Sequence, residues 1–144
     1  MQYPAVYALS KKHGPPKINL CDARILDDYG DESYATRPIN HRVPEDVVTK
    51  DFEFYPCVFS FMEFEDLLFY LYPIGVEFER KRSLTATEFY LYSLNSHVPR
   101  EFSKLPQVDQ EAFKEGLLWI CNATPADEFW RYKCRKLEAV IGYR

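Results

Sequence analysis

Long apolar runs are missing from this sequence, and so are the glycine-rich motifs of common nucleotide and hydrolase sites. No stretch approaches the ~20 apolar residues that a membrane-spanning helix requires, because residues 66–76 are apolar but short and contain Pro73 and Gly75. The chain has 5 glycines, none in a phosphate-loop, dinucleotide-binding or Gly-x-Ser-x-Gly setting. These absences argue against a transmembrane protein and against the enzyme classes that use those motifs.

Histidines and cysteines are few and widely spaced: His13, His41, His97, Cys21, Cys57, Cys121 and Cys134. Since no His-Glu-x-x-His motif and no paired Cys/His spacing occurs, we expect no metal site and no cofactor. Cys121 and Cys134 flank a predicted turn near residue 123. In two antiparallel helices that start at this turn they would be offset by roughly 13 Å, at ~1.5 Å per residue. This offset is too large for a disulfide, so we expect both thiols to be reduced and buried.

The first twelve residues lack the basic lead and the long apolar stretch of a signal peptide. Four cysteines without paired spacing do not form the framework of a disulfide-rich secreted domain either. Both observations lead us to expect a cytoplasmic protein.

Length and composition are typical of one globular domain that spans residues 1–144. Aromatic residues are abundant at 17% of the chain, and thirteen of the Phe and Tyr residues fall within 52–92. Rings of this number form either a closed core or a core with an aromatic pocket or contact face. The sequence alone leaves both possibilities open.

Hydrophobic periodicity predicts strands first and helices later. Period-two or short apolar runs indicate strands at 5–9, 18–26, 52–54 with a continuation at 57–61, and 76–79. Helical spacing and capping signals indicate helices at 60–73, 85–98, 106–121 and 124–141, with Pro73 and Pro99 as stops. We therefore predict an α+β fold. In it, an N-terminal, mostly antiparallel β-sheet packs against three to four C-terminal helices that end in an antiparallel helix pair.

Charge is distributed unevenly along the chain. The net charge of -4 and the pI near 5.4 disfavour nucleic-acid binding, which usually requires a basic face. Residues 22–34 carry five acidic side chains and one arginine, whereas residues 131–144 carry five basic side chains and one glutamate. Such separation can orient a protein partner or a second copy of the chain.

The leading functional hypothesis is a non-enzymatic protein-interaction module that binds another protein or itself. Its candidate contact residues are Tyr29, Tyr34, Arg131 and Arg135, since tyrosine and arginine are enriched in protein interfaces. Membrane and nucleic-acid partners are not expected. A weaker form of the hypothesis is acidic mimicry, in which residues 27–32 occupy a partner's nucleic-acid site.

The alternative is a small-molecule-binding protein or an enzyme with an aromatic-lined pocket between sheet and helices. Arg37, His41 and Arg42 form its candidate catalytic set at the mouth of that pocket. Arginines can hold a carboxylate or phosphate, and a histidine can transfer a proton near neutral pH. Enzymatic activity therefore stays open, although the lack of an assembled catalytic set disfavours it.

Overall fold

A computed structural model describes residues 2–123 and 128–142, and every regular element in these ranges is a helix. The α-helices are α1 (Pro4–Lys12), α2 (Leu20–Asp27), α3 (Thr49–Phe54), α4 (Phe64–Glu79), α5 (Leu84–Glu101), α6 (Gln107–Asn122) and α7 (Glu128–Ile141). Three 3₁₀ helices join them: η1 (Pro44–Asp46), η2 (Phe59–Phe61) and η3 (Phe102–Lys104). The predicted α+β fold with an N-terminal sheet is therefore wrong, because the described residues contain no strand.

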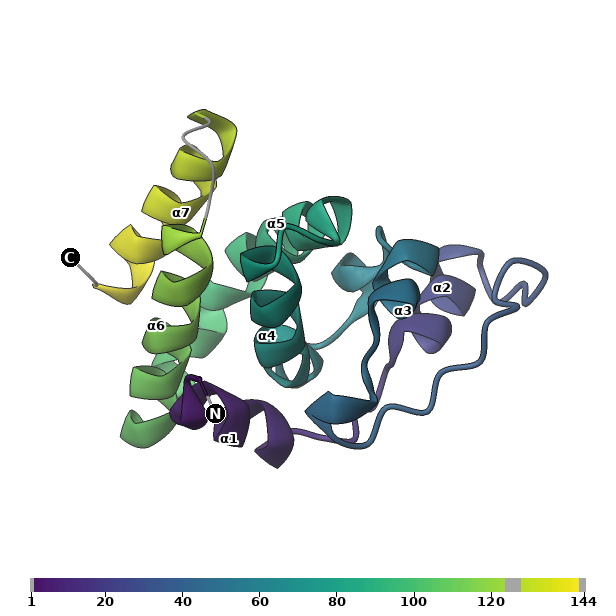
Figure 1. Ribbon diagram of the computed structural model, residues 1–144, viewed down its shortest axis with the longest axis horizontal. Helices are drawn as coiled ribbons and strands as arrows, with labels where there is room; N and C mark the ends of the chain where they lie inside the picture. Colours follow the sequence, from purple (N-terminus) through teal and green to yellow (C-terminus); the bar gives the residue numbers. More distant parts are fainter. Residues whose placement is uncertain (1, 124–127, 143–144) are drawn as a thin grey trace.

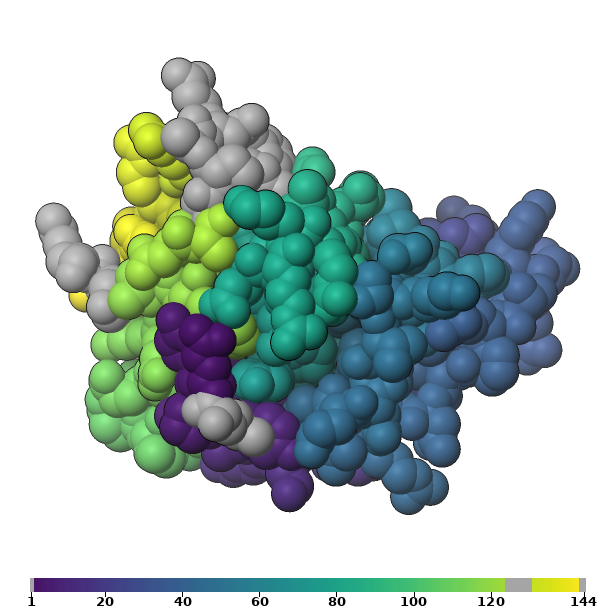
Figure 2. All heavy atoms as spheres, viewed as in Figure 1, coloured from purple at the N-terminus to yellow at the C-terminus, as the bar shows by residue number. Residues whose placement is uncertain are grey.

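Helix α4 lies at the centre of the molecule, where it packs against α1, α5 and α6 (Figure 1). Helix α7 lies against α5 and α6 at one end of the long axis. Helices α2 and α3 lie toward the other end, together with the irregular segment 28–43. In Figure 2 the atoms of this segment, in blue, protrude at the end of the molecule away from α7.

The segment 5–9 forms α1 instead of a strand. Pro4 stands in the first turn, where its fixed φ suits a helix and its missing N–H leaves no bond unmade. The buried side chains Val6, Leu9 and Ser10 are spaced by three and one residues, which places them on one helical face. A run this short has too few residues to distinguish the helical period from that of a buried strand.

The segment 18–26 forms α2 for a local reason as well. The Asn19 side chain accepts from the Asp22 amide at 2.9 Å, and the Asp22 carboxylate accepts from the Asn19 amide at 3.1 Å. This reciprocal capping box satisfies two free amides of the first turn. The buried residues Leu20 and Ala23 then follow at helical spacing.

The alternating segment 52–54 belongs to α3, and its two phenylalanines face opposite ways. Phe52 is fully buried, whereas Phe54 is 47% exposed. A strand would have placed both rings on one face, while two residues along a helix differ by about 200°. Of the predicted continuation 57–61, residues Phe59–Phe61 form η2.

Helices α4 and α5 both continue through the prolines that were predicted to end them. Helix α4 passes Pro73 and includes the segment 76–79 that was predicted as a strand, and α5 passes Pro99. One turn of α4 next to Pro73 is completed by α1: the Tyr72 amide donates to Ser10 Oγ at 3.0 Å, and Ser10 Oγ donates to the Leu68 carbonyl at 2.9 Å. A neighbouring side chain thus supplies hydrogen bonds at a place where proline disturbs the helix.

Rings of the aromatic-rich stretch 52–92 form much of the core around α4, although Phe54, Phe61, Phe89 and Tyr92 of this stretch are exposed. Its fully buried rings are Phe52, Tyr55, Phe59, Phe69, Tyr70, Phe78 and Tyr90. Several meet edge to face, including Phe59 with Tyr90, whose ring centroids are 5.3 Å apart. Edge-to-face pairs add to the free energy gained by burying the rings.

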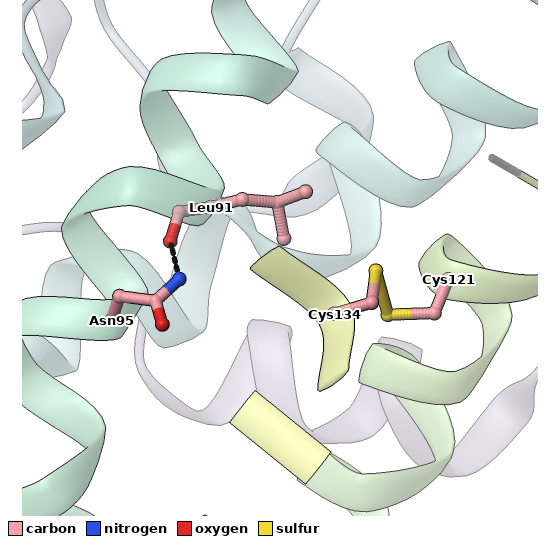
Figure 3. Close-up of a disulfide and its surroundings, with 4 residues drawn as sticks. All are labelled: Leu91, Asn95, Cys121 and Cys134. Carbon is pink, nitrogen blue, oxygen red and sulfur yellow. Dashed lines mark hydrogen bonds between the residues drawn. A yellow bond between two sulfur atoms is a disulfide. The ribbon is translucent and has the colours of Figure 1, made fainter. Parts of the chain in front are cut away.

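Helices α6 and α7 run in opposite directions and are joined by a Cys121–Cys134 disulfide (Figures 1 and 3). The prediction that both thiols stay reduced is wrong in this structure, because the two Cα atoms lie 5.8 Å apart. Helix α7 begins at Glu128, and its first turns extend past the end of α6, so that Cys134 comes level with Cys121. Of the helix predicted at 124–141, residues 124–127 lie outside the described residues.

Candidate functional site

Two of the three catalytic candidates converge on a residue that the sequence did not indicate, Asp51 of α3. His41 Nε2 lies 2.7 Å from Asp51 Oδ2, and Arg37 Nε donates to Asp51 Oδ1 at 2.8 Å. The Val48 amide donates to Asp51 Oδ2 at 3.1 Å. On the other side of the imidazole, His41 Nδ1 lies 2.9 Å from the Tyr70 hydroxyl. The result is a continuous Arg37–Asp51–His41–Tyr70 network.

Burial determines the protonation of this network. It lowers the pKa of His41 below its usual value, more than the Asp51 carboxylate raises it. Burial alone raises the pKa of Asp51, but hydrogen bonds from Val48, His41 and Arg37 bring it below its usual value. Burial also raises the pKa of Tyr70 well above its usual value. His41 is therefore neutral, with Nε2–H donating to Asp51 and Nδ1 accepting from the Tyr70 hydroxyl.

The network connects the irregular segment 28–43 to the helical core. The Tyr55 hydroxyl adds to this connection, because it donates to the Arg37 carbonyl at 2.7 Å and accepts from the Arg37 amide at 2.9 Å. A general acid or base must reach the proton it transfers, yet His41 and Tyr70 are both buried. The geometry therefore suits a structural role, in which these hydrogen bonds hold the segment 28–43 on the helical core, better than a catalytic role.

Arg42, the third catalytic candidate, does not join the network. It is exposed, and its backbone amide donates to Asp46 Oδ2 at 2.9 Å. Asp51 and Tyr70 complete the network from positions 10 and 29 residues beyond His41. No sequence signal links such distant positions, because only the fold brings them together.

Four hollows on the described surface have volumes between 280 and 380 Å³, and Arg37, His41 and Arg42 line none of these four. The largest of the four lies between η1 and α4, with Phe52, Tyr72 and Val76 in its walls and Glu77 and Arg80 at its polar side. Among the described residues, no group of three or more His, Cys, Asp or Glu side chains is arranged to hold a metal ion.

The last residue of α2 and the segment that follows it carry a cluster of acidic and tyrosine side chains, which we call the acidic end: Asp27, Asp28, Tyr29, Asp31, Glu32 and Tyr34. Tyr29 has a φ of 56° and a fully exposed ring, and Tyr34 is 64% exposed. Arg24, which ion-pairs with Asp28 at 2.9 Å, lies 5.3 Å from the centroid of the Tyr34 ring. Both predicted contact tyrosines are thus at the surface.

The outer side of α7 is the counterpart of the acidic end, and we call it the basic face: Arg131, Tyr132, Arg135 and Lys136. All four side chains are exposed, whereas Cys134, Leu137 and Ile141 on the same helix are buried. No ion pair among the described side chains uses Arg131, Arg135 or Lys136.

The four predicted contact residues therefore form two separate patches. Tyr29 and Tyr34 belong to the acidic end, and Arg131 and Arg135 to the basic face. Because α7 and the segment after α2 lie at opposite ends of the molecule (Figure 1), the patches cannot contact each other within one copy.

No protein-family model matches the chain, and no curated protein or solved structure does either. None of the helices in the described ranges 2–123 and 128–142 is both long and apolar enough to cross a bilayer.

Proposed function

We propose that this protein is a non-enzymatic interaction module that binds a protein partner through the basic face of α7. The observation that carries the proposal is that Arg131, Arg135 and Lys136 are exposed and enter no ion pair among the described side chains. Tyr132 adds an aromatic ring, 60% exposed, between them.

Composition and rigidity both support a contact role for this face. Arginine and tyrosine are the residues most often found at the energetic centre of protein interfaces. The face belongs to a helix that packs against α5 and α6 and buries Leu137 and Ile141 on its inner side. A fixed surface loses little conformational entropy on binding. The acidic charge of the complementary partner follows from the charge of the face.

Burial of the His41 network favours a binding protein over an enzyme. Of the three catalytic candidates, His41 is buried and hydrogen-bonded on both ring nitrogens, Arg37 is paired with Asp51, and Arg42 is exposed and apart. Their arrangement offers a substrate no shared point of contact.

Site-specific photocrosslinking in the cells that make the protein tests this function. With a photoreactive phenylalanine analogue at position 132, we expect discrete adducts with an acidic protein. The double variant R131E/R135E should lose them. The control K50E/K81E, which makes the same change of charge at two exposed lysines, should keep them. Adducts that survive R131E/R135E, or no adducts above those from a probe at position 50, would contradict the proposal.

Small-molecule binding is the second candidate, and the 380 Å³ hollow between η1 and α4 favours it. Its walls combine the rings of Phe52 and Tyr72 with the charges of Glu77 and Arg80, a composition typical of small ligand sites. A thermal-shift screen tests it, because a ligand at a hundred times its Kd adds ~2.7 kcal/mol of stability. A hit should be lost in Val76→Trp, which fills the hollow.

The proposed compartment is the cytoplasm, and it stands in tension with the Cys121–Cys134 disulfide. Disulfides persist in oxidising compartments and are rare in the cytosol. Thiol trapping of the protein, taken rapidly from its native cells, decides between the cytoplasm and an oxidising compartment. Cytosolic protein should alkylate at Cys121 and Cys134 as well as at the free Cys21 and Cys57. Protection of the first pair would place the protein in an oxidising compartment.

A further inference from the structure

We propose that copies of this chain associate head to tail, with the acidic end of one copy seated on the basic face of α7 of the next. This inference rests on the proposed function, since it uses the same face of α7, and it names the partner as a second copy of the chain.

Complementary charges remain available on both surfaces. Arg131, Arg135 and Lys136 enter no ion pair among the described side chains, and neither do Asp27 and Glu32 of the acidic end. Each surface thus presents free charge of the sign that the other requires. Opposite free charges on two surfaces steer encounter and fix the orientation of docking.

Aromatic side chains add a second kind of complementarity. The backbone that ends α2 holds Tyr29 outward, because the Tyr29 amide donates to the Leu26 carbonyl at 3.2 Å and the Gly30 amide donates to the Ile25 carbonyl at 2.8 Å. The exposed ring is flanked by Asp28 and Asp31. Arg131 and Arg135 lie one helical turn apart, a spacing at which two guanidiniums can contact one inserted ring.

Charge and position together exclude a symmetric pairing through either surface. Two basic faces would repel each other, and so would two acidic ends. Because the two surfaces lie at opposite ends of the molecule (Figure 1), each copy keeps one surface free after the first contact forms. A contact between unlike surfaces generates open chains or rings instead of a closed dimer.

The association is weak and depends on salt, because exposed charges are strongly screened. Attraction between the surfaces acts over ~30 Å at 0.01 M salt but over only ~3 Å at 1 M. We therefore expect the dissociation constant to rise about tenfold or more between these ionic strengths. This salt dependence is measured on the unaltered chain and needs no variant.

Sedimentation equilibrium of the full chain, combined with two charge-reversal variants, tests the proposal. At low salt, the average mass of the unaltered chain should keep rising with concentration, past the mass of a dimer. R131E/R135E lacks the basic face and D27K/E32K lacks the acidic charge, so each should be monomeric alone. Mixed, they should associate, because one supplies an intact acidic end and the other an intact basic face. The control K50E/K81E should associate like the unaltered chain.

The proposal is overturned if the unaltered chain stays monomeric at low salt, if either variant associates alone, or if the mixture stays monomeric. Circular dichroism verifies that each variant is folded. If a variant does not fold, the salt dependence of association of the unaltered chain decides the test. A monomeric chain that still crosslinks to a different protein through position 132 would overturn only this inference. A monomeric chain without such adducts would overturn the proposed function as well.

Discussion

The Ser10 side chain of α1 connects two backbone groups of α4, the Tyr72 amide and the Leu68 carbonyl. Its Oγ accepts from the Tyr72 amide at 3.0 Å and donates to the Leu68 carbonyl at 2.9 Å, so that it bridges the two groups that a regular helix would join directly. The bridge connects α1 to the central helix across 62 residues of sequence.

Replacing Ser10 with alanine should lower the free energy of unfolding by about 2–3 kcal/mol. The substitution removes the bonds that Ser10 makes to the buried Leu68 carbonyl and to the partly buried Tyr72 amide, and a buried unpaired polar group costs about 1–3 kcal/mol. Urea denaturation measures the change. Ser96→Ala, at an exposed position of α5, is the matched control and should change stability by less than about 0.5 kcal/mol. Equal effects of the two substitutions would show that the bridge contributes nothing.

Close packing of Gly75 in α4 against Trp119 in α6 gives a second prediction. A Cβ at position 75 would overlap the Trp119 ring. The ring is held in place by stacking on Tyr3, with centroids 4.5 Å apart, and by donation from Trp119 Nε1 to Glu79 Oε2 at 2.7 Å. Alanine normally favours a helix over glycine by about 1 kcal/mol, but here overpacking should destabilise the protein by about 1–3 kcal/mol.

The thermal midpoint of Gly75→Ala should therefore fall. In a Trp119→Leu background, where the ring is gone, the same substitution should raise it. A higher midpoint for Gly75→Ala in the natural background would mean that the two helices can move apart at little cost.

The sequence predicted the C-terminal helices better than the N-terminal segments, for reasons of length. The segments 85–98 and 106–121 are long enough to repeat the helical period several times. Helix α5 covers the first, and α6 matches the second with a shift of one residue. The segments 5–9 and 18–26 are too short for a period to decide between strand and helix. The prediction that Pro73 ends a helix was wrong for another reason. Ser10 of α1 supplies hydrogen bonds to α4 next to Pro73, and no local sequence pattern connects these two residues.

Site prediction had a similar limit. Exposure of Tyr29, Tyr34, Arg131 and Arg135 follows from polar neighbours in the sequence, and all four are at the surface. The environment of His41 depends instead on Asp51 and Tyr70, which belong to two other helices. The sequence analysis placed His41 at the mouth of a pocket, whereas the fold buries the imidazole.

Burial of neutral His41 should make stability fall on acidification. Burial lowers its pKa in the folded state, while in the unfolded state the pKa is ~6.5. Below pH ~6.5 the unfolded chain therefore binds a proton that the folded chain does not, so the free energy of unfolding decreases as pH falls. The slope is at most ~1.4 kcal/mol per pH unit for one group. Asp51, whose folded pKa is also lowered, adds a similar loss only near pH 4 and below.

Urea denaturation between pH 7.5 and 5 checks this prediction. His41→Gln should be less stable at pH 7.5 and should show a smaller slope. Burial lowers the pKa of His13 too, so the comparison belongs in a His13→Gln background, which removes that contribution to the slope. An unchanged slope after His41→Gln in that background would mean that the imidazole is not buried in its neutral form.

The disulfide between α6 and α7 should determine how firmly the basic face is held. It closes a loop with a sequence separation of 13 residues, and a loop of about this length is associated with ~3 kcal/mol of stabilisation. Apart from this bond, α7 packs against α5 and α6, but far fewer of its described side chains are buried than on α4, with Leu137 and Ile141 as the other two. In C121A/C134A, hydrogen exchange should therefore accelerate in α7 far more than in the central α4, since helices with few buried contacts open first.

Cys57→Ala, at an exposed free thiol, is the control and should leave both helices unchanged. Equal protection of α7 with and without the bond would show that α5 and α6 hold this helix by packing alone, and the basic face would then be just as rigid in a reducing compartment.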